Sequence, residues 1–194
     1  MAEGQDLMSE SFQIVARLDA PSRRLRYSQV GIFYVKNQVS AFPERGWTDF
    51  VEDLIRIWAT TILGMLVASE RKNMLIFMDG SYEIMVLRRG DGLRLVGMNT
   101  GFDTRSTKTG WTADVGIVEM FHELHSASRT LLRDARKRKY PPRRIASFEV
   151  LEMKLRVLHR LCKAAMVDID NSRAFAEENA RDTPVKVRRG KKTR

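Results

Sequence analysis

Residues 49–69 restrict the fold more than any other part of the sequence, because their apolar side chains recur at the period of an α-helix. The apolar stripe is broad and consists of Phe50, Val51, Leu54, Ile55, Ile57, Trp58, Ile62, Met65 and Leu66. A stripe that covers so much of the circumference predicts a helix buried in the core. Thr48 is placed to cap the start of this helix. Asp49, Glu52 and Asp53 put negative charge at the positive end of its dipole.

An antiparallel meander is predicted after this central helix. The apolar run 73–78 ends at Asp79-Gly80, a dipeptide that favours a two-residue hairpin turn. Further strands are expected over 82–87 and 93–98, separated by a second glycine-containing turn. Residues 100–111 are polar and contain several Gly, Ser and Thr, so this segment is expected to be either a long loop or an exposed edge strand.

Strands are also predicted before the central helix. Residues 11–18 alternate between apolar and polar side chains, which is the period of a half-buried strand. Apolar residues cluster over 27–35 and again over 39–42. These two clusters predict a second strand and a short third one.

Two helices are predicted in the last third of the chain. The first is expected to run from Asp114, which can act as its N-cap, to about Arg138. Pro141 and Pro142 end it, and Ser147 can cap the second helix. The apolar residues of both helices lie three and four positions apart, which favours a helical hairpin, or one helix on the sheet with the other covering it. The second helix also allows a homodimer contact, although about three heptads do not strongly favour one.

Together these elements predict one α+β domain over residues 1–170. It contains an antiparallel sheet of about five or six strands, one central helix packed on the sheet and two C-terminal helices. In 194 residues, 43% apolar side chains are enough to build a core. The helical pattern fades after residue 170, and the basic residues 171–194 are expected to form a disordered tail.

Positive charge is concentrated near the C-terminus. Residues 1–128 contain 14 Lys and Arg against 16 Asp and Glu, whereas residues 129–194 contain 20 against 8. The densest basic run is Arg133, Arg136, Lys137, Arg138, Lys139, Arg143 and Arg144. Such a run could bind nucleic-acid phosphates, or it could be a solvated helix end whose cations favour the negative end of the dipole. No helix-turn-helix, zinc finger or RNP-type strand accompanies it, so sequence-specific readout is not indicated.

The sequence shows no residue constellation typical of catalysis or metal binding. His122 and His125 share a helix face, but their spacing is not that of zinc proteases and a third ligand is missing. No serine lies in a Gly-x-Ser-x-Gly motif. Cys162 falls in an apolar helix stripe, which favours an inert thiol. We therefore expect a protein that is not an enzyme and that uses neither a cofactor nor a metal.

Cysteine content and hydropathy predict a cytoplasmic location. The single cysteine excludes an internal disulfide and suits a reducing compartment, and no secretory signal is visible at the N-terminus. The longest apolar run, residues 57–69, is shorter than the roughly 20 residues that a membrane-spanning helix needs. No membrane span is expected.

A set of aromatic, proline, glycine and aspartate residues resembles, in its order, small bacterial immunity proteins of polymorphic-toxin systems. The set comprises Phe42-Pro43, Gly46-Trp47-Thr48-Asp49-Phe50, Trp58 and Phe77-Met78-Asp79-Gly80-Ser81-Tyr82. The resemblance covers about residues 30–135, and these positions define a fold more than an activity. It implies that the protein binds one cognate toxin stoichiometrically and covers its active site or another essential surface, which requires no catalytic residue.

The resemblance also suggests where a toxin could bind. Immunity to a nuclease usually implies an acidic face that opposes a basic cleft. The candidate residues for such a face are Glu44, Asp49, Glu52 and Asp53. Because the chain is basic overall, the alternative is a toxin that is not a typical basic nuclease. The second candidate function is association with nucleic acid through the basic run and the basic C-terminal residues.

Overall fold

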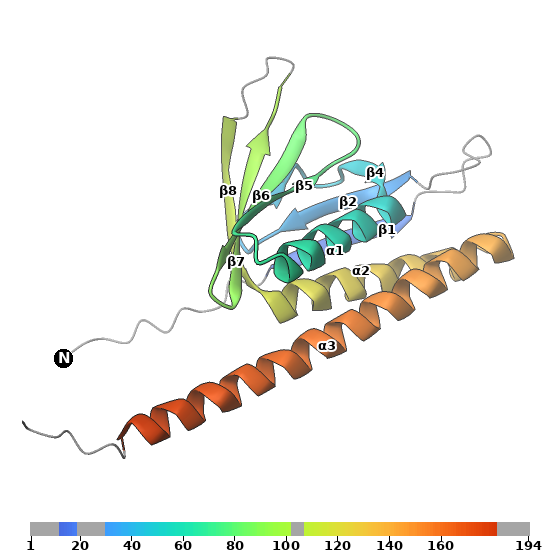
Figure 1. Cartoon of the computed structure of the whole chain (residues 1–194). Helices are drawn as coiled ribbons and strands as arrows, with labels where there is room; N and C mark the ends of the chain where they lie inside the picture. The colour runs from blue at the N-terminus through green and yellow to red at the C-terminus, as the bar shows by residue number, and fades with distance from the viewer. Residues whose placement is uncertain (1–11, 19–29, 102–106, 182–194) are drawn as a thin grey trace, which may run out of the picture.

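The computed structural model of the protein describes residues 12–18, 30–101 and 107–181. Within these residues, two four-stranded antiparallel sheets and three helices form the fold (Figure 1). The predicted α+β class is therefore confirmed. The strands are arranged differently from the prediction of one sheet of about five or six, because the chain divides them between two sheets.

The first sheet is built around one strand that pairs with three others. This strand is β2 (Val30–Lys36), and its partners are β1 (Gln13–Leu18), β3 (Ala41–Phe42) and β4 (Thr48–Phe50). In the β1–β2 register, Gln13 faces Lys36 and Leu18 faces Gly31. Phe12, Ile14, Ala16 and Leu18 are all buried. The alternation predicted for residues 11–18 is therefore confirmed over the described part of that segment.

The central helix, α1 (Val51–Val67), begins later than the sequence predicted. Thr48 and Asp49 belong to β4, whose backbone pairs with Ile32 and Gly31 of β2. Phe50 occupies the N-cap position, and no side chain caps the helix. The prediction that Thr48 caps the helix is therefore wrong, because strand pairing holds this backbone in an extended conformation. Most of the predicted stripe is buried, namely Val51, Leu54, Ile55, Trp58, Ile62 and Met65. Ile57 and Leu66 are only partly buried, and Phe50 belongs to β4.

The second sheet is the predicted meander with an additional edge strand. Its strands lie in the order β5 (Lys72–Ile76), β6 (Tyr82–Arg89), β7 (Gly92–Asn99) and β8 (Thr107–Gly116). For residues 107–111, β8 decides between the two predicted alternatives, since its first half is an exposed edge strand. Residues 102–106 of that segment lie outside the described residues. Asp114 lies inside β8 and is not an N-cap. The next helix has Gly116 at its N-cap position, and the Gly116 N–H donates to Glu119 Oε2 at 3.3 Å.

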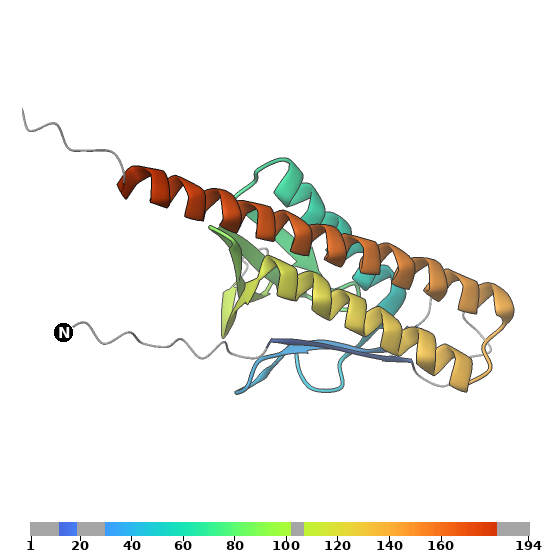
Figure 2. The same ribbon diagram turned by 90° about the horizontal axis from the view of Figure 1, so that it is seen from below.

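The last two helices form a hairpin, one of the two predicted arrangements, and α2 also contacts β1 as in the other. α2 (Ile117–Lys137) and α3 (Pro142–Arg181) lie side by side along most of α2, as Figures 1 and 2 show. α3 begins at Pro142, a residue type suited to the first helical turn because it lacks an N–H. Ser147 therefore lies within α3 and does not cap it.

α3 is longer than the sequence predicted. It continues to Arg181, so residues 171–181, predicted to belong to a disordered tail, are helical. These residues contain neither proline nor glycine and include three alanines and two glutamates, which favour a helix. The rest of the predicted tail, residues 182–194, lies outside the described residues. No helix in the described part of the chain is both long enough and apolar enough to cross a membrane.

Carboxylates of α2 bind the backbone of β1 on the side away from β2. The Ile14 N–H donates to Glu123 Oε2 at 3.1 Å, and the Leu18 N–H donates to Asp134 Oδ2 at 3.4 Å. Burial raises the pKa of Glu123, and the hydrogen bond from Ile14 opposes this shift. α2 therefore covers an edge whose unpaired N–H groups would otherwise be open to another strand.

An aromatic cluster joins the two sheets to α1. Phe33 of β2 makes an edge contact with Trp58 of α1, with ring centroids 5.0 Å apart. Phe42 of β3 stacks on Trp111 of β8 at 5.5 Å. The Trp58 Nε1–H donates to the Ile76 carbonyl at 2.8 Å. Phe42 and Trp58 therefore lie at the junction of the two sheets and α1.

Candidate interaction groove

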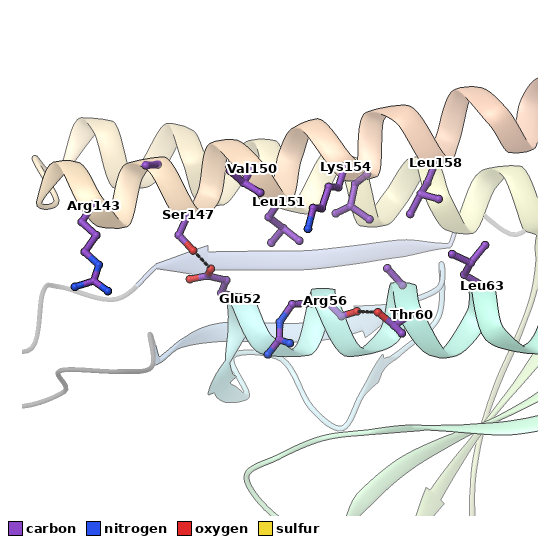
Figure 3. A pocket seen from close by; sticks show the side chains of 13 residues that line it. Glu52, Arg56, Thr60, Leu63, Arg143, Ser147, Val150, Leu151, Lys154 and Leu158 are labelled. Carbon is purple, nitrogen blue, oxygen red and sulfur yellow. Dashed lines mark hydrogen bonds between the residues drawn. The ribbon is translucent and has the colours of Figure 1, made fainter.

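A groove of about 610 Å³ lies between α1 and α3. Its apolar lining consists of Ala59, Leu63, Ala146, Val150, Leu151, Leu155 and Leu158. Its polar and charged lining includes Glu52, Arg56, Thr60, Arg143, Ser147 and Lys154. Figure 3 shows Leu63 of α1 and Leu158 of α3 pointing toward one another at one end of the groove. The volume and the mainly apolar lining are typical of a binding site.

The groove exists because both helices use their largest apolar side chains elsewhere. α1 buries Trp58, Ile62 and Met65 in the core. α3 places Phe148 in the same core, and its most extensive helix contact is with α2. The side of α1 that faces α3 carries the small residues Ala59 and Thr60, which leave space between the helices.

Polar contacts define the other end of the groove. The Ser147 hydroxyl donates to Glu52 Oε1, which joins α3 to α1 (Figure 3). Thr60 Oγ1 donates to the Arg56 carbonyl at 2.9 Å, so this hydroxyl is satisfied within α1. The one carboxylate that lines the groove is therefore already bound.

Three cations lie at the rim of the groove. Arg56 forms an ion pair with Asp53 at 2.7 Å. Figure 3 shows Arg143 and Lys154 extending from α3 toward α1. Neither of these two has an acidic partner within 4.0 Å in the part of the chain that the structure describes. The rim therefore favours a ligand that carries negative charge.

The four acidic residues predicted to bind a toxin do not form one open acidic face. Glu44 is exposed, Glu52 is bound to Ser147, and Asp53 is paired with Arg56. Asp49 is only 1% exposed. Its Oδ2 accepts hydrogen bonds from the N–H groups of Met78 and Asp79 at 2.9 and 3.2 Å.

Asp49 is therefore a structural residue, and its predicted place on a toxin-binding surface is wrong. Its Oδ1 accepts from the Phe50 N–H at 2.7 Å. The carboxylate joins β4 to the turn after β5, because it binds backbone groups on both sides. In the sequence nothing distinguishes it from Asp53, since both are acidic residues near the start of an apolar helix.

α3 carries a second apolar stripe that the sequence analysis missed. Val150, Met153, Val157 and Leu161 are 47%, 47%, 49% and 60% exposed. Their spacing of three, four and four residues places them on one side of the helix. This spacing is present in the sequence, but the prediction used the stripe through Phe148, Leu151 and Leu155 as the apolar face of the helix.

The predicted basic run surrounds the turn between α2 and α3, which lies at one end of the hairpin (Figure 2). Arg133, Arg136, Lys137, Arg138, Lys139 and Arg143 are exposed, and Arg144 is half-buried. Arg136 forms an ion pair with Glu149 at 2.7 Å. A hollow of about 550 Å³ on this hairpin is lined by Arg129, Arg133, Arg136 and Arg156, together with Glu149 and Glu152.

All three histidines of the chain meet between α2 and α3. The ring of His159 lies 5.2 Å from that of His122 and 6.2 Å from that of His125. His125 Nε2 is 2.8 Å from Glu152 Oε1. No group of three or more His, Cys, Asp or Glu side chains among the described residues has the arrangement of a metal site. The sequence spacing predicted that His122 and His125 lie close together on one helix. The proximity of His159 depends on the packing of α3 against α2.

Acidification is expected to weaken the packing of this hairpin. Burial, followed by the nearby His122, His125 and Lys163, lowers the pKa of His159. Below the usual pKa of about 6.5, the unfolded chain therefore binds a proton more readily than the folded one, and stability falls as the pH falls. The melting temperature should drop more between about pH 7.5 and about pH 5.5 in the wild type than in His159→Gln. Equal drops in both proteins would contradict this assignment.

Burial also raises the pKa of the Cys162 thiol. The thiol is half-buried on α3 and packs against the core. It is therefore protonated at neutral pH, which makes it a poor nucleophile.

Comparisons with protein-family models, with curated proteins and with solved structures found no match for this chain.

Proposed function

We propose that this protein acts by binding another protein, as an immunity protein that neutralises one cognate toxin in the cytoplasm of the bacterium that makes it. The observation that carries the proposal is the groove between α1 and α3, which presents apolar side chains inside a charged rim. Buried apolar residues bordered by arginine are typical of the centre of protein interfaces.

The resemblance to immunity proteins supplies the specific class of binding protein. The residues that carry it include Trp58, Phe77 and the buried Asp49, which position α1 relative to both sheets. α1 in turn provides one wall of the groove. α1 therefore links the two arguments, because it carries part of the resemblance and also forms part of the groove.

The charge of the groove bears on the kind of toxin. Glu52, Asp49 and Asp53 are engaged within the protein, and the rim of the groove carries Arg56, Arg143 and Lys154. Such a rim complements an acidic surface and opposes a basic one. Of the two alternatives drawn from the sequence, we favour a toxin that is not a typical basic nuclease.

The proposal predicts that the protein rescues growth. A toxin domain encoded beside this gene is expressed from an inducible promoter, with and without the full-length protein. Growth should be restored only when the protein is present, and the two purified proteins should elute together as an equimolar complex, because neutralisation by binding is stoichiometric. An unrelated toxin is the control and should remain lethal. Undiminished killing by the neighbouring toxin, with the protein folded and in excess, would reject the proposed function.

Nucleic-acid association is the second candidate function. It is favoured by the basic residues around the α2–α3 turn and by the arginine-lined hollow beside them. Binding that depends on phosphates should weaken steeply between about 50 mM and about 200 mM salt. Charge reversal of Lys137 and Arg138 should then abolish retention on single- or double-stranded nucleic acid. Retention that both charge reversal and salt leave unchanged would remove this candidate.

A further inference from the structure

The groove between α1 and α3 continues onto the exposed apolar stripe of α3. Val150 belongs to both features, because it lines the groove and is 47% exposed. Val157 and Leu161 follow it at seven and eleven residues, which keeps all three on one side of the helix. At about 1.5 Å per residue, the surface from Val150 to Leu161 is about 16 Å long, or about three helical turns.

The shape of this surface suits one helix of another protein, docked between α1 and α3. One wall is formed by α1 through Ala59 and Leu63, and the other by α3 through Val150 and Leu158. A trough between two helices can receive the apolar face of an additional helix, whose residues at i, i+4 and i+7 fill it. An amphipathic helix therefore matches both the length and the composition of the surface.

The charges beside the groove indicate which charged residues the polar face of the docked helix should carry. Arg56, Arg143 and Lys154 border the apolar lining, while the carboxylate of Glu52 is bound to Ser147. Acidic side chains on the flanks of a docked helix would pair with these cations, and basic ones would be repelled.

The same charges argue against two alternative occupants. A second copy seated in the groove would bring its own Arg143 and Lys154 to a rim that already carries Arg56, Arg143 and Lys154. Residues 186–194 of this chain contain six Lys and Arg and no Asp or Glu, so they carry the same sign as the rim. Neither a second copy nor the C-terminus of this chain therefore complements the groove.

We infer that the groove binds an amphipathic α-helix of a partner protein, with apolar residues at i, i+4 and i+7 and acidic residues on its flanks. The inference rests on the proposed function and names the structural element of the toxin that is held. The docked helix lies along α3 from the Ser147 end toward Leu161, covers the exposed apolar stripe and pairs its carboxylates with Arg143 and Lys154.

The test is a selection of peptides against the full-length protein. The probe is a phage-displayed library of random peptides of about 16 residues, which span about 24 Å as a helix. We expect the selected peptides to be acidic, to show the helical apolar period and to gain helical circular dichroism on binding. The inference is overturned if the selection yields no peptide, or yields basic peptides or peptides without that period.

Matched variants show whether the selected peptides occupy the groove. Val150→Asp and Lys154→Glu should each weaken binding of the best peptide by at least about tenfold, because they remove an apolar contact or reverse a rim charge. Val39→Asp and Lys108→Glu are the controls. They introduce the same changes at exposed positions outside the groove and should alter binding less than about twofold. Equal effects in both pairs would overturn the inference.

Two further results separate this inference from the proposed function. If Val150→Asp and Lys154→Glu neutralise the toxin as well as the wild type does, the helix inference fails and the immunity function stands. If no toxin is bound at all, the immunity function fails, and the peptide selection still decides whether the groove accepts an acidic helix. A homodimer in solution that Val150→Asp dissociates would assign the groove to a second copy and overturn the inference.

Discussion

Replacement of Asp49 by alanine is expected to lower the free energy of unfolding by about 3 kcal/mol or more. The carboxylate is buried and accepts hydrogen bonds from three backbone N–H groups, those of Phe50, Met78 and Asp79. Alanine would leave these donors without their acceptor at the place where β4 meets the turn after β5. A donor that loses its partner costs about 1–3 kcal/mol when it is buried, and these three part-buried donors together account for about 3 kcal/mol.

Asp53 provides the matched control for this experiment. It is also acidic and near the start of α1, but it is partly exposed, and among the described residues its one ion-pair partner is Arg56. Asp53→Ala should cost less than about 0.5 kcal/mol, since exposed ion pairs contribute little. Asp49→Asn, which retains one carbonyl oxygen as an acceptor, should fall between the two. Urea denaturation measures all three variants, and equal losses for Asp49→Ala and Asp53→Ala would contradict the structural role.

Replacement of Gly31 by alanine is expected to destabilise the protein by about 3 kcal/mol, at the upper end of the usual cost of overpacking. A Cβ atom at this position of β2 would lie 2.2 Å from the Arg17 carbonyl oxygen and 3.1 Å from Val51 Cγ1. The carbonyl belongs to β1, which is paired with β2 over its whole length. The clash therefore cannot be relieved by rotating a side chain, and the two strands must separate.

Gly64→Ala should have the opposite effect. Gly64 lies within α1, is exposed, and would have no atom within 4 Å of an added Cβ. Alanine is favoured over glycine within a helix by about 1 kcal/mol, so the midpoint of chemical denaturation should rise. A Gly31→Ala protein that unfolds at the wild-type midpoint would show that β1 and β2 do not approach as closely as described.

The candidate site was less accessible to sequence reasoning than the fold. Glu52 was correctly placed near the start of α1, but its partner Ser147 lies 95 residues away in the chain. The apolar stripe that includes Val150 could have been found from its spacing. The groove could not be predicted in this way, because it is the space between α1 and α3. That space depends on how α1 packs on the sheets and how α3 packs on α2.

Periodicity in the sequence alone determined the α+β class, the buried face of α1, the meander and the presence of two C-terminal helices. These features follow from local spacing, because a side chain's place on a helix or strand depends on its immediate neighbours. Only the tertiary structure decided that the strands form two sheets, that Thr48 to Phe50 pair with β2, and that Asp49 is buried while Asp53 is partly exposed. Only the tertiary structure placed α1 and α3 as the two walls of the apolar groove with its cationic rim. Burial and strand pairing are contacts between distant segments, so two residues with the same local pattern can end in opposite environments.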